Sequence, residues 1–147
     1  MKCSGVLRLP ADVAEDLRRW AAQAWPAEAC GLLVGRSSAG ATEVARATLA
    51  RNLRAGEQGD RYEVDPADHL AAWKSSEAEG LAVIGAWHSH PDHEPVPSAT
   101  DRAEACERLS YLIAAVHAGR AGELRAWRLV DGVFQEEVVD ILEPSRS

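Results

Sequence analysis

Apolar residues recur every three or four positions in three stretches of the chain, and this spacing predicts helices. The first stretch follows Pro10, carries apolar residues from Val13 to Ala24 on one face, and ends at the next proline. In the second, Asp65 is expected to cap the N-terminus and Gly80 to follow the last turn. These two stretches therefore carry both a periodic face and the residues that begin and end helices.

The apolar residues of the second and third helices predict which faces are buried. In the second helix, Leu70 and Trp73 share one face, and we expect that face to pack against the rest of the protein. A third helix is predicted over residues 98–109, with a thin apolar stripe made of Ala99, Ala103, Cys106 and Leu109.

Short apolar or alternating runs predict strands between and after the helices. Asp131-Gly132 separates the last two runs and indicates a hairpin turn. The order of elements predicts one α/β domain over residues 1–147, with a mixed, mostly antiparallel sheet flanked by helices and a frayed tail over 140–147. The expected strands cover residues 6–9, 30–36, 42–49, 62–64, 81–90, 111–117, 123–130 and 133–140.

Charge and composition narrow the classes of partner. The net charge is -7 and the basic residues are scattered, which argues against nucleic acid and anionic membranes as partners. The longest apolar run, LAVIGAW, is too short to span a bilayer, and the first ten residues contain no apolar leader. Three widely spaced cysteines do not make a disulfide framework. We therefore expect a cytoplasmic protein.

The stretch WHSHPDHEPVPSATD gathers ionisable side chains at the end of the apolar run. His88 and His90 are two positions apart on a predicted strand, so both side chains leave the same face and can share one metal ion. Pro91 ends the strand, and the helix that follows can bring Asp101 back over the histidines. Two imidazoles and one carboxylate leave a fourth position for water, which is the pattern of a catalytic zinc site.

Hydrolysis at such a site also needs a base that takes and returns a proton, and a carboxylate is the simplest choice. Glu28, just before the CGLLVG strand, is the best remote candidate. Spacing alone leaves four other glutamates open, namely Glu43, Glu63, Glu94 and Glu104.

Several of these residues also have ordinary structural explanations. Ser98 and Asp101 have the spacing of a helix cap and a first-turn acid. His69, His93 and His117 fit exposed or structural positions better than a ligand set. The cysteines are expected to be buried as small apolar residues, with Cys106 on the stripe of the third helix.

The complete pattern is far more specific than its parts. Glu28, followed by His88-Ser89-His90-Pro91, six residues, Ser98, two residues and Asp101, resembles the JAMM motif of MPN-type metalloproteases, E…H-[ST]-H-P-x6-S-x2-D. The segments EACGLLVG and RYEVDPADHLAAW also resemble that family, and the similarity extends over residues 7–139.

This resemblance implies an MPN/JAB fold of the cytidine-deaminase-like type and a role for each residue of the motif. His88, His90 and Asp101 would hold Zn²⁺, and Glu28 would be the proton shuttle, which selects it from the five glutamates. Ser98 would hydrogen-bond the tetrahedral oxyanion.

The resemblance also implies a class of substrate. Because the predicted loops are short, the chain looks more like the small bacterial members that process the C-terminal Gly-Gly of ubiquitin-like sulfur-carrier proteins. The alternatives are a non-catalytic MPN-type binding module, a deubiquitinase-like isopeptidase of broader specificity, and a hydrolase that removes a small group from a metabolite. The sequence does not determine the oligomeric state.

Overall fold

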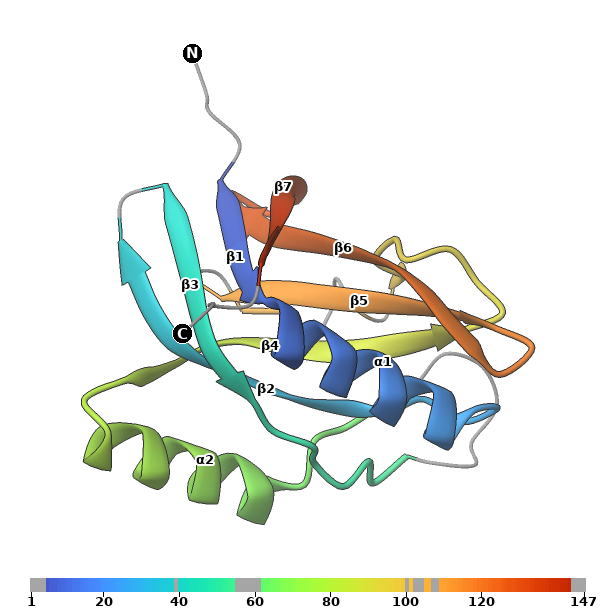
Figure 1. Cartoon of the computed structure of the whole chain (residues 1–147), viewed down its shortest axis with the longest axis horizontal. Coiled ribbons are helices and arrows are strands. Elements are labelled where there is room, and N and C mark those ends of the chain that lie inside the picture. The colour runs from blue at the N-terminus through green and yellow to red at the C-terminus, as the bar shows by residue number, and fades with distance from the viewer. Residues whose placement is uncertain are drawn as a thin grey trace.

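The described residues form a closed β-barrel with two helices packed against it (Figure 1). The computed structural model describes residues 5–38, 40–54, 62–99, 101, 105–106 and 109–143. Its elements are β1 (Val6–Pro10), α1 (Ala11–Ala24), β2 (Cys30–Ser38), β3 (Ala41–Ala47), α2 (Pro66–Ala78), β4 (Ala82–Pro91), β5 (Ser110–His117), β6 (Arg120–Val130) and β7 (Val133–Leu142).

Strands follow the order β1-β3-β2-β4-β5-β6-β7 around the barrel, and β7 returns to β1. The pairs β1–β3, β1–β7 and β4–β5 are parallel, and the other four are antiparallel. The predicted mixed sheet is therefore present, but it is not an open sheet with flanking helices. Parallel pairing of β1 with both β3 and β7 joins the edges, and apolar periodicity carries no signal for that closure.

Helix α1 and the barrel share the main hydrophobic core. Its residues Val13, Leu17 and Ala21 are buried, as their spacing predicts, and they join a cluster that includes Leu7, Leu33, Trp87 and Leu112. Pro10 occupies the N-cap position of this helix.

Helix α2 packs on β2 and β4 with a different face from the predicted one. Its buried residues are Ala72 and Ser76, while Leu70 and Trp73 are each 49% exposed. The prediction for this face was wrong, because small side chains let the helix approach the strands closely and the large ones lie on the other side. The predicted ends are confirmed: the Asp65 side chain accepts the backbone N–H of Ala67, and Gly80 has a φ of 72°.

Other predictions are corrected near the ends of elements. Residues 62–64 form no strand, and only Val64 makes an isolated bridge, to Asn52. Asp140 and the two residues after it belong to β7 and pair with β1, so the tail does not begin at residue 140, and residues 144–147 lie outside the described part. The turn at Asp131-Gly132 is confirmed, with φ values of 50° and 78°.

The predicted third helix, 98–109, lies largely outside the described residues. Ala99 and Asp101 are helical, whereas Ala105, Cys106 and Leu109 are not. Cys106 is exposed, which corrects its predicted burial, while Cys30 is buried as expected. Within the described ranges, neither α1 nor α2 has the length and apolar character that a bilayer span requires.

Candidate metal centre

Strand β4 presents both histidines of the HSHP segment on one face of the barrel wall. It lies between β2 and β5, with Cys30 opposite His88, and Ala114 and Ala115 beside Ser89 and His90. His88 and His90 are 1% and 3% exposed. Trp87 instead points into the core, as the alternation of a strand requires.

Asp101 returns over the two rings, and three atoms that could bind one metal ion lie close together. Nε2 of His88 lies 3.2 Å from Nε2 of His90, and each of these atoms lies 3.2 Å from Oδ2 of Asp101. All three residues are buried, and their ligand atoms lie within 4.8 Å of one another. Ligand atoms at about 2.0 Å from a tetrahedral zinc ion lie about 3.3 Å apart, so this triangle has the size that zinc requires.

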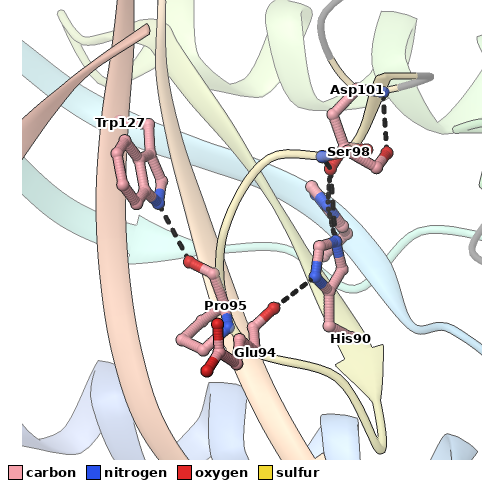
Figure 2. A network of polar contacts seen from close by, with 7 residues as sticks. His90, Glu94, Pro95, Ser98, Asp101 and Trp127 are labelled. Atoms are coloured by element: carbon pink, nitrogen blue, oxygen red, sulfur yellow. Dashed lines mark hydrogen bonds and ion pairs between the residues drawn. The ribbon is translucent and has the colours of Figure 1, made fainter.

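The hydrogen bond made by Nδ1 of His90 suits this ring to metal binding through Nε2. Its Nδ1 lies 2.8 Å from the carbonyl oxygen of Glu94, which can only accept, so Nδ1 carries the proton (Figure 2). In the neutral ring, Nε2 therefore presents a lone pair toward Asp101. Burial raises the pKa of Asp101, but its hydrogen bonds with His88 and His90 outweigh burial and hold the pKa well below its usual range. The carboxylate oxygen and the two ring nitrogens, 3.2 Å apart, therefore need a proton or a metal ion between them.

Ser98 and Asp101 hold each other through the backbone. The Ser98 N–H donates to Oδ2 of Asp101 at 2.9 Å, and the Asp101 N–H donates to the Ser98 hydroxyl at 3.0 Å (Figure 2). This is the reciprocal arrangement of a helix cap. The Ser98 hydroxyl accepts in this contact, so its own proton remains available to a substrate oxygen.

Glu28 is 5% exposed and lies two residues before Cys30, which pairs with His88. The backbone of its neighbour Ala29 makes two hydrogen bonds with Ser89, the residue between the two histidines. Burial lowers the pKa of His90, but its hydrogen bonds with Asp101 and the Glu94 carbonyl, together with the charges of Asp101 and Glu28, outweigh burial and raise this pKa. Glu28 therefore acts electrostatically on a ligand of the candidate site.

Three of the other four candidate bases do not share this position. Glu43 and Glu63 are exposed and pair with Arg8 and Arg54 at 3.1 Å and 3.2 Å, and Glu94 is exposed. Glu104 lies outside the described residues. His69, His93 and His117 are exposed, which agrees with their predicted surface positions.

Three further residues shape the site, and the sequence assigned a role to none of them, although Asn52 and the RYEVDPADHLAAW segment that contains Tyr62 resemble the middle region of MPN-type metalloproteases. The ring of Tyr62 stacks on His88 with centroids 4.2 Å apart and planes 18° from parallel. Trp127 of β6 donates its indole N–H to the carbonyl of Pro95 at 3.0 Å (Figure 2). Asn52 donates to the carbonyl of Glu28 at 3.0 Å. Each contact joins residues far apart in the chain or depends on a backbone oxygen.

Comparison with known proteins agrees with this geometry. Residues 10–130 match the family of prokaryotic homologs of the JAB domain. The chain belongs to this family. The JAB-domain protein is 40% identical over 106 residues to a desampylase of Haloferax volcanii, covering 69% of this chain and 74% of the relative. It is 31% identical over 139 residues to the CysO-cysteine peptidase of Mycobacterium tuberculosis, covering 94% of this chain and 92% of the relative.

A solved structure supports the fold of the JAB-domain protein. The solution structure of a protein from Desulfitobacterium hafniense superposes with a TM-score of 0.82 and is 29% identical, covering 94% of each chain. The predicted membership of an MPN/JAB family is therefore confirmed.

Proposed function

We propose that this JAB-domain protein is a zinc-dependent peptidase or isopeptidase. Its substrate would be the amide bond that follows the C-terminal Gly-Gly of a ubiquitin-like sulfur-carrier protein. The observation that carries the proposal is the buried triangle of His88, His90 and Asp101, in which two imidazole nitrogens and a carboxylate oxygen lie 3.2 Å apart. Two imidazoles and one carboxylate suit zinc and leave room for a substrate atom.

The residues around the triangle supply the remaining requirements of amide hydrolysis. Bound zinc would supply Lewis acidity to the attacking water and to the scissile carbonyl. Glu28 takes a proton from the water as the carbon–oxygen bond forms, and gives a proton to the amine as the carbon–nitrogen bond breaks. The Ser98 hydroxyl donates to the oxygen that becomes negative between these steps.

The assignment of Glu28 rests on its burial and its position. A carboxylate that exchanges protons with a substrate must lie within reach of the reacting atoms. Glu43 and Glu63 are exposed, whereas Glu28 is buried, and its neighbour Ala29 is hydrogen-bonded to Ser89 of the histidine strand. The exposed position of Glu94 also makes it the weaker candidate.

The substrate class is supported by the relatives and by the resemblance of the motif. One relative is a desampylase and another is a CysO-cysteine peptidase, and the latter aligns over nearly the whole of both chains. The leaving group is accordingly either a single amino acid or the lysine side chain of a conjugated protein.

The test uses two substrates built on one ubiquitin-like carrier protein. In the first, the Gly-Gly end is extended by one cysteine; in the second, it is linked to a lysine side chain. We expect zinc-loaded protein to release a carrier that ends in Gly-Gly, as read by mass spectrometry, and a chelator to stop the release. A carrier ending in Ala-Ala is the control. The proposal fails if the zinc-loaded protein cuts neither substrate, or if cleavage is equal after zinc is removed.

A further inference from the structure

The side chain of Asn52 connects the backbone of the candidate base, Glu28, to two other backbone positions. Its Nδ2 donates to the carbonyl oxygen of Glu28 at 3.0 Å. Its Oδ1 accepts the N–H groups of Arg54 and Glu63, each at 2.9 Å. The donor end and the acceptor end of the amide are thus both engaged, which fixes the orientation of the side chain.

The contact to Glu28 lies where regular strand pairing has ended. The antiparallel pairing of β2 with β4 begins at Cys30, opposite His88. Ala29 is held to β4 by Ser89, whose hydroxyl accepts the Ala29 N–H at 2.8 Å and whose N–H donates to the Ala29 carbonyl at 3.0 Å. The peptide group between Glu28 and Ala29 is therefore held at its N–H by Ser89 and at its carbonyl by Asn52.

We infer that Asn52 is a positioning residue for Glu28, an inference that rests on the proposed function. A peptide group held at both its N–H and its carbonyl is fixed in its plane, and this fixes the position of the Glu28 Cα relative to the histidine strand. A displacement of about 1 Å in a catalytic group can lower a rate about 100-fold. Asn52 touches neither the metal ligands nor the reacting atoms in this arrangement, and it acts through the backbone of Glu28.

Two substitutions separate this role from a purely structural one. Asn52→Asp keeps an oxygen that accepts from Arg54 and Glu63 but replaces the donor to the Glu28 carbonyl by a second acceptor. Asn52→Ala removes all three contacts and adds no charge. If Asn52 only held the Arg54 and Glu63 backbone together, Asn52→Asp would preserve function.

A matched control is available on the same segment. The carboxylate of Asp68 accepts the backbone N–H of Arg51 at 2.7 Å, and this bond anchors the residue next to Asn52 without contacting Glu28. Asp68→Ala therefore removes one anchor of the same segment and leaves the Glu28 carbonyl contact in place.

The experiment measures kcat, KM, zinc affinity and melting temperature for the three variants with the cysteine-extended carrier. We expect Asn52→Asp and Asn52→Ala each to lower kcat about 10- to 100-fold, the loss typical of groups that orient catalytic residues. KM and zinc affinity should stay within about twofold of the parent protein, because ground-state binding and the metal ligands are unchanged. Asp68→Ala should keep kcat within about twofold.

Glu28→Gln, measured alongside, distinguishes a failure of the proposed base from a failure of the positioning role of Asn52. Normal turnover by Glu28→Gln would overturn the assignment of the base itself. If Glu28→Gln is inactive and Asn52→Asp turns over normally, only the positioning role of Asn52 is overturned. Equal losses of kcat in Asn52→Ala and Asp68→Ala would also overturn it, because general loosening of the segment would then explain both.

Discussion

His90 shows how its surroundings decide what a single side chain offers. The carbonyl of Glu94 accepts a hydrogen bond from Nδ1. In the neutral ring, Nε2 is therefore left with a lone pair that can bind a metal ion. The motif identified His90 as a candidate ligand, because two histidines two apart on a strand share a face. It could not identify Glu94 as the orienting group, because that contact uses a backbone oxygen that every residue possesses.

Glu28 is the residue whose role is most sharply testable. Glu28→Gln preserves size but removes the basic carboxylate, so we expect kcat to fall about 10²- to 10⁴-fold, the usual contribution of a general base. Zinc affinity, measured by competition with a chromophoric chelator, should be unchanged. Glu94→Gln is the control and should be near normal; the opposite pattern would assign the base to Glu94.

Ser98 caps the Asp101 N–H, and we propose that its hydroxyl also stabilises the oxyanion. We expect Ser98→Ala to lower kcat about 10²- to 10³-fold through loss of an oxyanion donor, with little change in KM. It should also lower the free energy of unfolding by about 1 kcal/mol, because the Asp101 N–H loses its cap. Ser98→Thr keeps the hydroxyl and should recover most of both. If Ser98→Ala is less stable but turns over normally, Ser98 has only the capping role and is not an oxyanion donor.

At the scale of elements, β6 supports the loop that follows β4. The indole of Trp127 holds the carbonyl of Pro95, a buried residue next to the carbonyl that orients His90 (Figure 2). Arg125 lies over the Trp127 ring at 4.9 Å and is itself paired with Glu136 of β7. A neighbouring pair of strands thus fixes the backbone that orients a candidate metal ligand.

Trp127→Phe tests this support with a small change in shape. We expect zinc affinity to fall about 10-fold, since groups that orient a ligand are typically worth 10- to 100-fold. Trp73→Phe is the matched control, because Trp73 is half exposed on α2 and lies away from this network. Equal zinc affinity in Trp127→Phe and the parent protein would show that the loop holds its position without the indole.

The positions of most helices and strands were predictable from the sequence. The prediction failed for the buried face of α2, which is set by how closely the helix packs on the strands. Capping residues and apolar spacing located α1 and α2, and the apolar run located β4. The buried face of α2 was predicted wrongly, because Leu70 and Trp73 are larger and more apolar than Ala72 and Ser76, which approach the strands. Side-chain size and hydrophobicity do not report how closely two elements pack.

At the scale of the whole molecule, the main hydrophobic core and the candidate metal site lie on opposite sides of β4. Trp87 is part of the core that joins α1 to the strands, and the alternation of the strand places His88 and His90 on the other face. Closure of the barrel gives this core its shape, and it depends on β1 pairing with two strands that are distant in sequence. The sequence predicted the strands but could not predict closure, because either edge of β1 could have remained unpaired.

This separation predicts what removal of the metal does. We expect chelation to abolish turnover and leave the far-ultraviolet circular dichroism spectrum unchanged. The melting temperature should fall, because a ligand present at 100 times its Kd stabilises the folded state by about 2.7 kcal/mol. Loss of the circular dichroism signal on chelation would mean that the ion is part of the fold.

The central claim is that one divalent ion is shared by His88, His90 and Asp101, and anomalous diffraction at the zinc edge tests it most directly. Crystals of protein loaded with one equivalent of zinc should show one strong peak, about 2.0–2.2 Å from Nε2 of both histidines and from a carboxylate oxygen of Asp101. A peak elsewhere, with these three side chains contacting no ion, would contradict the account.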